Sequence, residues 1–501
     1  MRAAAIFSSN MVLQREKPIS VWGDARDGTL VTVRLADFSA TSTARDGVWR
    51  VQLPPMPAQE GLTMTVSSDD ETHVFTNVSV GEVWLCGGQS NMEFELRNEK
   101  SGKALLASLT PKSGLRFYYT PKQRVKNDEF ASIERNTCWN LATPETAGSW
   151  SAVGVYFALE LHKRLGVTVG LIGCNWGGTS ATAWISRDDI AAHNAIRSYL
   201  DDYDAAMAGK TEAQHIEEYN AYISYEGAWW QRCSVYYETH PDASWDEVTE
   251  NCGESHYPPP MGPVCELRPA GLYDTMLSRV SPYTLRGFLY YQGESDDHKP
   301  RTYDILLQTL IARWRSDWHD DTLPFLVVQL PKYKPAADPD YCHWCLIREA
   351  QRKVCRTTKN TGLAVILDCG EFDNIHPKDK LQVGYRLALQ AFYEVYGILD
   401  DAAANPPRYR DFYTDGSILT LRFDNAAQGF RTDLSLNGFE IAGDDLEWHD
   451  AKAEIENDVI TLQSDAVPHP LHARYAWRNY PDVTLYGANG LPVSPFCTDD
   501  I

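Results

Sequence analysis

The chain has 501 residues, of which 43% are hydrophobic and 23% charged, a balance typical of a globular protein with two or three domains. Its formal net charge of −22 argues against nucleic acid and anionic membrane surfaces as partners, because both would repel it. No segment has the length and apolarity of a signal-peptide core or a transmembrane helix, and the eleven cysteines are scattered. We therefore expect a cytoplasmic protein with reduced thiols.

Residues 1–79 predict a β-rich domain, because short runs of β-branched and aromatic residues alternate with Gly, Asp and Pro. These runs are 21–23, 31–35, 49–53 and 64–66. From residue 80 to about 400 the pattern changes to apolar strands at 83–86, 169–174, 287–291, 325–330 and 363–367, with helices at 155–165, 303–318, 346–354 and 380–396. This alternation predicts an α/β domain with a parallel sheet between helices.

Two further segments flank or interrupt this domain. Residues 191–270 are polar, aromatic and spotted with proline, which predicts a partly helical insertion near the carboxyl ends of the strands. From residue 401 to 501 short strands return, at 419–423, 459–462 and 483–486, and predict a second β-rich domain.

The stretch GGQSNM at 87–92 contains the first candidate for chemistry, Ser90. Gly87 and Gly88 follow an apolar strand and permit a sharp turn, which would place Ser90 above the carboxyl end of the strand, where ligands bind in open α/β sheets. Met92 stands where a nucleophile elbow has glycine, so that motif is absent. Ser90 is a candidate nucleophile, and the alternative is a serine that caps a turn or helix.

A serine nucleophile needs a base, and the run Asp373-Asn-Ile-His376 supplies a histidine. A carboxylate three residues before His376 is able to fix the tautomer of the ring, although Asn374 is an alternative orienting group. The run also fits a capping aspartate beside a surface histidine. Its place after a predicted strand and before a helix favours the catalytic interpretation.

Donors for an oxyanion are predicted in two further turns, at 171–179 and 288–296, which also follow strands. A backbone amide of Gly177 or Gly178 and the side chain of Gln292 are candidates to join the amide of Ser90. Each turn alone is compatible with a purely structural role. Complementary chemistry in four strand-end turns indicates one active site.

The runs GGQSNM, GGTSATAW, YQGESD and DNIHPKDK resemble the four conserved blocks of the SGNH/GDSL hydrolases, in the carbohydrate-esterase branch typified by sialate O-acetylesterases. The opening SSNMVLQREKPISVWG resembles the N-terminal β-domain of that branch, and LIREAQ its helix before the last block. The resemblance implies a three-layer α/β/α SGNH fold at 80–400, flanked by the β-rich domains, and the removal of acetyl groups from sugar hydroxyls without a metal or organic cofactor.

Carried over residue by residue, the resemblance makes Ser90 the nucleophile and His376 the base. It assigns the oxyanion hole to Ser90, Gly178 and Gln292, the last where other SGNH enzymes have asparagine. Members of the branch often have aspartate two residues before the histidine, where this chain has Asn374. The third triad member is therefore Asp373, by the general SGNH spacing.

Other residues are predicted to support the site or to contact substrate: Gln89, Asn91, Gly177, Glu294, Trp229 and Trp230. The two tryptophans and Trp176 are candidates for stacking on sugar rings, with core packing as the alternative. Glu294 and Asp296 form an acidic pair that permits a glycosidase interpretation, which we disfavour because the serine and histidine would have no role. A zinc site at Cys342 and Cys345 is not expected, since no second cysteine pair follows at the required spacing.

The expected substrate is a small acetylated sugar or oligosaccharide. One alternative keeps the chemistry and changes the substrate to acetylated xylan or xyloglucan oligosaccharides. Another is a noncatalytic carbohydrate-binding protein, which the intact serine, histidine and oxyanion blocks argue against. The sequence leaves the oligomeric state open, a homo-oligomer included.

Overall fold

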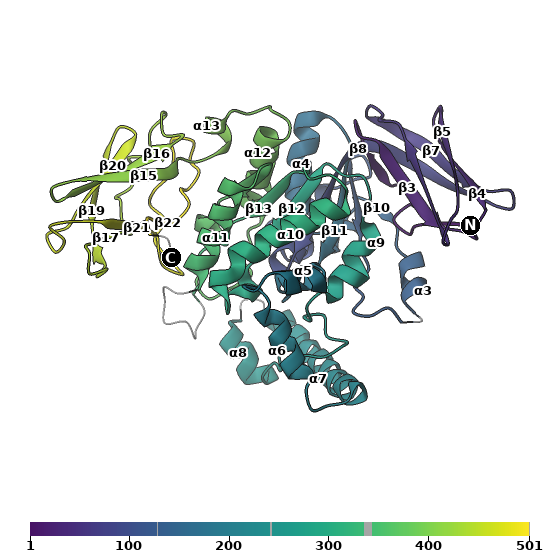
Figure 1. Ribbon diagram of the computed structural model, residues 1–501, viewed down its shortest axis with the longest axis horizontal. Helices are drawn as coiled ribbons and strands as arrows, with labels where there is room; N and C mark the ends of the chain where they lie inside the picture. Colours follow the sequence, from purple (N-terminus) through teal and green to yellow (C-terminus); the bar gives the residue numbers. More distant parts are fainter. Residues whose placement is uncertain (128, 241–242, 335–342, 500–501) are drawn as a thin grey trace.

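The computed structural model covers residues 1–127, 129–240, 243–334 and 343–499 in describable detail. Figure 1 shows a central α/β body with a β-rich part at each end of the chain and a group of helices projecting from one side. Within the described ranges, no helix combines the length and the apolarity that crossing a membrane requires.

The N-terminal strands alternate buried and exposed residues, as strands with one face in a core do. In β6 (Val48–Leu53), Trp49, Val51 and Leu53 are buried and the residues between them are exposed. The other strands are β1 (Arg2–Ala3), β2 (Val12–Gln14), β3 (Ile19–Asp24), β4 (Leu30–Leu35), β5 (Phe38–Thr43) and β7 (Gln59–Ser67). All four strands predicted here from the sequence are confirmed.

The central sheet has the strand order β10-β9-β11-β8-β12-β13-β14, and every neighbouring pair is parallel except β10 with β9. Its strands are β8 (Thr72–Gly88), β9 (Leu115–Tyr119), β10 (Trp139–Leu141), β11 (Val169–Asn175), β12 (Gly287–Tyr291), β13 (Phe325–Val328) and β14 (Thr361–Ala364). The predicted strands lie in this sheet and run parallel to their neighbours, while the antiparallel β10 makes the sheet mixed. The domain boundary predicted at residue 79 falls inside β8, which also pairs with β2 and β7. This boundary stays a prediction.

Helices cover both faces of this sheet. Successive residues of a strand point to opposite faces. In β8, Cys86 faces α4 (Ala152–Leu165), because a Cβ added at Gly154 of that helix would lie 2.9 Å from Cys86 Sγ. The next residue, Gly87, faces α10 (Tyr303–Asp317), because a Cβ added at Gly87 would lie 2.5 Å from Trp314. The helices of the body are α1 (Ser90–Glu93), α2 (Gly102–Ser108), α3 (Phe130–Arg135), α4 (Ala152–Leu165), α5 (Arg187–Ala192), α9 (Ser278–Val280), α10 (Tyr303–Asp317), α11 (Trp344–Thr357), α12 (Leu381–Glu394) and α13 (Asp401–Ala404).

Short 3-10 and π turns complete the body: η1 (Leu96–Asn98), η2 (Ala147–Ser149), η3 (Ala181–Trp184), η4 (Tyr273–Leu277), η5 (Glu294–Asp296), η6 (Pro300–Thr302) and η7 (Leu367–Cys369). Of these, η5 directly follows the end of β12, and η7 lies between β14 and α12. Both therefore belong to the loops at the carboxyl edge of the sheet.

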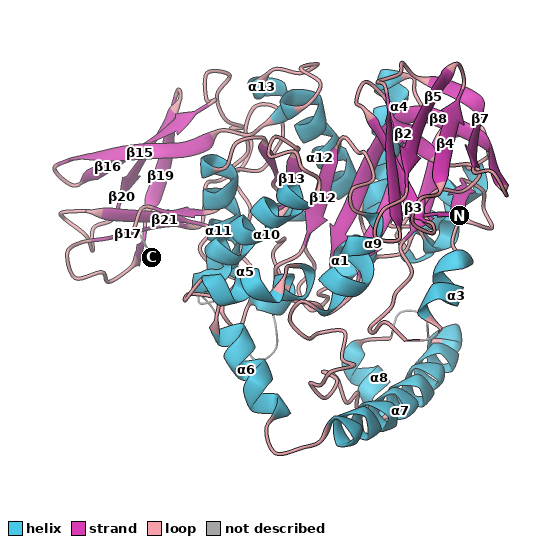
Figure 2. Cartoon of the chain, turned by 45° about the vertical axis from the view of Figure 1, so that its right-hand side comes forward, coloured by secondary structure: helices cyan, strands magenta, loops and turns pink. Residues whose placement is uncertain are grey.

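The predicted insertion is largely helical and contains α6 (Ser198–Met207), α7 (Glu212–Thr239) and α8 (Trp245–Cys252). Figure 2 shows these helices projecting from the central body. A capping box of Thr211 and Gln214 starts α7. Trp229 and Cys233 of α7 pack on Val248 and Cys252 of α8 in a small core of their own.

The C-terminal part contains two four-stranded sheets around a separate core. The strands are β15 (Arg408–Asp415), β16 (Ile418–Asp424), β17 (Phe439–Ala442), β18 (His449–Asp450), β19 (Lys452–Glu456), β20 (Val459–Gln463), β21 (His472–Tyr475) and β22 (Phe496–Cys497). The strand predicted at 483–486 is wrong. The N–H groups of Thr484 and Leu485 donate to the hydroxyl of Tyr475, at 3.3 and 2.9 Å, and this segment runs as a loop.

Candidate active site

The two glycines before Ser90 are required by the backbone. Gly88 has φ +130°, and a Cβ there would lie 2.1 Å from the carbonyl oxygen of Tyr291. A Cβ at Gly87 would strike Trp314. A larger residue at position 87 or 88 would clash or be strained, so β8 ends in two glycines. The chain then turns, and Ser90 begins α1.

Ser90 and His376 meet at the carboxyl edge of the sheet. The Nε2 atom of His376 lies 2.8 Å from the Oγ of Ser90, although 286 residues separate them in the chain. Burial, and secondarily the positive charge of Lys380, lower the pKa of His376 to about 4. The ring is therefore neutral near pH 7, and its Nε2 is able to accept the hydroxyl proton.

The loop that carries His376 is held by side chains of its own. Asn374 Oδ1 accepts the backbone N–H of His376 at 3.0 Å, and Asn374 Nδ2 donates to Glu371 at 2.8 Å. Glu371 also accepts the N–H of Lys378. Among the hydrogen bonds of the described residues, none joins Asp373 to the His376 ring. The orienting role of Asp373 stays a prediction.

The loop after β11 brings two glycines to the nucleophile. The N–H of Gly177 donates to Glu93 at 2.7 Å, and a Cβ at Gly177 would lie 3.3 Å from that of Ser90. Gly178 has φ +75°, and its carbonyl oxygen accepts the hydroxyl of Tyr257 at 3.4 Å. In the hydrogen bonds of the described chain, the N–H of Gly178 has no acceptor, so it remains a candidate donor for an oxyanion.

Gln292 is placed differently from its predicted role. Its side chain is fully buried, and its amide donates to the carbonyl oxygen of Thr179 at 3.2 Å and to Asp296 at 2.6 Å. Its Oε1 accepts the hydroxyl of Tyr303 at 2.8 Å. Both amide hydrogens are thus used inside the protein. Here Gln292 braces the β11 loop and presents no free donor to an oxyanion.

Asp296 organises the same loop, a role that the sequence reasoning missed. This buried carboxylate accepts from Ser180 Oγ at 2.5 Å, the N–H of Ala181 at 2.9 Å and the hydroxyl of Tyr199 at 2.9 Å, besides Gln292. It joins the loops after β11 and β12 to α6. Because its oxygens already have four donors, Asp296 is not available as a glycosidase acid.

Gln89 and the tryptophans, which were predicted to support the site or to contact substrate, differ in where the structure places them. Gln89 is buried, and its Oε1 accepts the N–H of Ser295 at 3.1 Å, which fixes the turn after β12. Trp229 is fully buried against α8 and cannot stack on a sugar, so that prediction is wrong. Trp230 is 53% exposed, and Trp176 is half-buried beside the ammonium of Lys122.

Tyr257 is a site residue that the sequence reasoning did not select. It belongs to the insertion, its side chain is 57% exposed, and its hydroxyl lies at Gly178. The segment before it is anchored, because Ser255 donates to Glu226 and the ring of His256 stacks on Tyr225 with centroids 3.6 Å apart. An aromatic residue directly before the run Pro258–Pro260 was the available signal.

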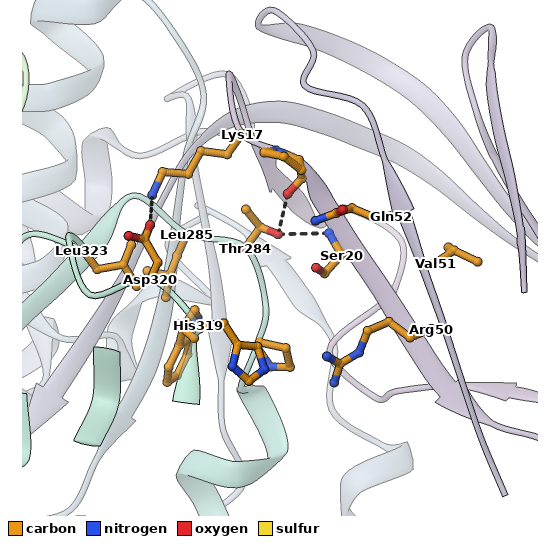
Figure 3. Close-up of a pocket in the computed structure, with 13 residues that line it drawn as sticks. Lys17, Ser20, Arg50, Val51, Gln52, Thr284, Leu285, His319, Asp320 and Leu323 are labelled. Carbon is orange, nitrogen blue, oxygen red and sulfur yellow. Dashed lines mark hydrogen bonds and ion pairs between the residues drawn. The ribbon is translucent and has the colours of Figure 1, made fainter. Parts of the chain in front are cut away.

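A cavity of about 520 Å³ lies elsewhere, between β3 and β6 and the segments that precede β12 and β13 (Figure 3). Thr284 and the ion pair of Lys17 with Asp320, 3.2 Å apart, contribute to its wall. It therefore adjoins the amino ends of the parallel strands, at the edge of the sheet opposite Ser90.

Within the described part of the chain, no group of three or more His, Cys, Asp or Glu side chains is arranged to hold a metal ion. Cys342, of the Cys342–Cys345 pair that the sequence offered, lies outside the described residues.

A hydroxyl bonded to an imidazole at the carboxyl edge of a parallel sheet, beside backbone N–H groups, is the arrangement of a serine hydrolase. Residues 266–392 match the family model "Carbohydrate esterase, sialic acid-specific acetylesterase".

Relatives extend the match to nearly the whole chain. Sialate O-acetylesterases of Mus musculus and Homo sapiens are 26% and 25% identical over 99% of this chain, and over 94% and 92% of their own lengths. A carbohydrate acetylesterase structure from Xanthomonas citri is 29% identical, with a TM-score of 0.79 and 100% of each chain covered. The chain is similar to sialate O-acetylesterases over nearly its whole length, and it is an esterase, an enzyme that hydrolyses esters.

Proposed function

We propose that this enzyme removes acetyl groups from sugar hydroxyls through an acetyl-enzyme on Ser90, in a central domain with the three-layer α/β/α fold of SGNH hydrolases. The observation that supports the proposal most is the 2.8 Å contact between Ser90 Oγ and His376 Nε2. Helices on both faces of a parallel sheet agree with the proposed fold.

In the proposed mechanism, His376 takes the proton of Ser90 as the hydroxyl oxygen attacks the acetyl carbonyl carbon. The tetrahedral oxyanion is stabilised by the N–H groups of Ser90 and Gly178. When the ester C–O bond breaks, His376 returns the proton to the leaving sugar oxygen. Water then attacks the acetyl-enzyme by the same route, and acetate and free Ser90 result.

The identity of the sugar is the finer part of the proposal. The names of the relatives point to acetylated sialic acid. The net charge of −22 and the pairing of Lys122 with Glu93 beside Gly177 favour a neutral sugar, such as an acetylated xylan or xyloglucan oligosaccharide. Acetate release from a panel of both substrate classes decides between them. Binding without acetate release from any ester would instead identify a noncatalytic carbohydrate-binding protein.

The third residue of the catalytic group is tested by comparing Asp373→Asn with Asn374→Ala. Since Asn374 holds the backbone of His376 and Asp373 has no bond to the ring, we expect kcat to fall less than about tenfold in D373N. N374A is expected to lose more, because the His376 loop loses its support. A loss near 10⁴-fold in D373N, the cost of the wrong imidazole tautomer, would restore Asp373 as the third triad member.

Tyr257 is proposed to contact the sugar. Removing its exposed ring in Tyr257→Ala is expected to raise KM for the acetylated sugar about tenfold, the equivalent of about 1.4 kcal/mol of aromatic contact. KM for 4-nitrophenyl acetate, which lacks the sugar, is expected to change little. Tyr413→Ala is the matched control, because this tyrosine is 50% exposed in the C-terminal part. Equal changes for both substrates would contradict a sugar contact.

A further inference from the structure

A fully buried lysine lies behind the Ser90–His376 pair. Lys380 directly precedes α12, and its Nζ donates to Asn91 Oδ1 at 2.6 Å. The ammonium also lies over the rings of Phe94 and Tyr291, 4.9 and 5.5 Å from their centroids. Burying a charge is costly unless it is compensated, and the mechanism derived above makes no use of this one.

Asn91, whose Oδ1 accepts the hydrogen bond from Lys380, connects the segment that carries Ser90 with the loop that carries His376. It follows Ser90 in the chain, and its Nδ2 donates to the carbonyl oxygen of Ile375, the residue before His376, at 2.9 Å. The same amide donates to Glu294 Oε1 at 2.6 Å. One side chain therefore fixes the neighbour of the nucleophile to the neighbour of the base and to the loop after β12.

Glu294, the other residue that Asn91 contacts, is also buried, and its Oε2 has no hydrogen-bond partner among the described residues. Burial raises the pKa of Glu294 to about 7, so that below this pH the carboxyl is neutral and Lys380 keeps its charge. Burial also lowers the pKa of Lys380, to about 8. Besides burial, the charges of the neighbouring carboxyl groups of Glu294, Glu371 and Glu99 act on Lys380, and they raise its pKa.

We propose that Lys380, Asn91 and Glu294 form one positioning unit, which joins the segment carrying Ser90 to the loop carrying His376 and places a buried cation behind the catalytic pair. The inference rests on the proposed function, in which His376 is the base. All three side chains are buried, and the unit acts through the two residues that react.

The sign of the electrostatic effect follows from the charge. A cation near an imidazole disfavours the imidazolium, and Lys380 is the charged neighbour that, after burial, lowers the pKa of His376. The acid limb of kcat/KM reports the protonation of the free enzyme's base. Removing the cation therefore moves this limb to higher pH.

The first experiment compares pH profiles of kcat/KM, measured as acetate release from 4-nitrophenyl acetate. In Lys380→Met the acid limb is expected to move up from near pH 4 toward the ordinary histidine value of 6.5. Glu294→Gln is the matched control, because the carboxyl is already neutral at that pH, so its acid limb is expected to stay with wild type. A folded K380M whose acid limb coincides with that of wild type would overturn the electrostatic part.

The second experiment tests the positioning and does not depend on K380M folding. Asn91→Asp keeps the shape and the acceptor for Lys380, and loses both donors, to Ile375 and Glu294. We expect kcat to fall about 100-fold, because the reacting groups are misplaced, and KM to change little. Asn98→Asp, at an exposed position, is the control.

An N91D enzyme with the kcat of wild type would overturn the positioning part. These outcomes are separate from the proposed function, which fails if wild type releases no acetate or if the enzyme remains active without the Ser90 hydroxyl.

Discussion

Ser90→Ala is expected to lower kcat for 4-nitrophenyl acetate by about four to six orders of magnitude, the range found when a serine hydrolase loses its nucleophile. The hydroxyl that His376 contacts at 2.8 Å is then absent, so no acetyl-enzyme forms. The backbone N–H groups that we assign to the oxyanion remain, and they support the small residual rate. The measurement is acetate release under saturating substrate, together with the burst of 4-nitrophenol that we expect before steady state in wild type.

Two controls make this result specific. Ser108→Ala removes another serine hydroxyl, at an exposed position in α2, and is expected to keep wild-type kcat. A fluorophosphonate probe is expected to add its mass to the wild-type chain at Ser90 and to leave S90A unmodified. Near-normal activity of S90A would remove the acetyl-enzyme mechanism, whatever the other variants do.

The elements around Ser90 were predictable because their signals are local. A parallel strand buried on both faces is an apolar run ended by glycine or a polar residue, and β12 has the residues predicted for it, 287–291. The meeting of Ser90 with His376 was predictable from two short motifs, each placed after a strand of one parallel sheet. Parallel strands bring their carboxyl ends to one edge, so distance along the chain did not matter.

Other features depend on partners that no local pattern names. The Gln292 amide turns to Thr179 and Asp296, and Trp229 is covered by α8, because of packing between segments far apart in sequence. The segment 483–486 has the composition of a strand, but its N–H groups find the hydroxyl of Tyr475. The domain boundaries and the cytoplasmic location stay predictions from the sequence, which leaves the oligomeric state open.

His376→Gln is expected to lower kcat/KM for 4-nitrophenyl acetate by at least about 10⁴-fold, since Ser90 loses the base that takes its proton. The pH dependence carries more information than the loss. Burial lowers the pKa of His376 to about 4, and a lowered pKa keeps the ring neutral, and thus competent as a base, down to that pH. The wild-type kcat/KM is therefore expected to stay level from pH 7 to about pH 5, and the residual activity of H376Q to lack this acid limb.

His193→Gln, at an exposed position, is the control and is expected to keep both the rate and the wild-type profile. A wild-type acid limb near the ordinary histidine value of 6.5 would contradict the expectation, because it requires something that stabilises the imidazolium and offsets its burial. A carboxylate turned toward the ring would do so, and Asp373, three residues earlier, is the candidate. In that case D373N would move the acid limb of kcat/KM to lower pH, since removing an anion favours the neutral ring, whereas K380M moves it to higher pH.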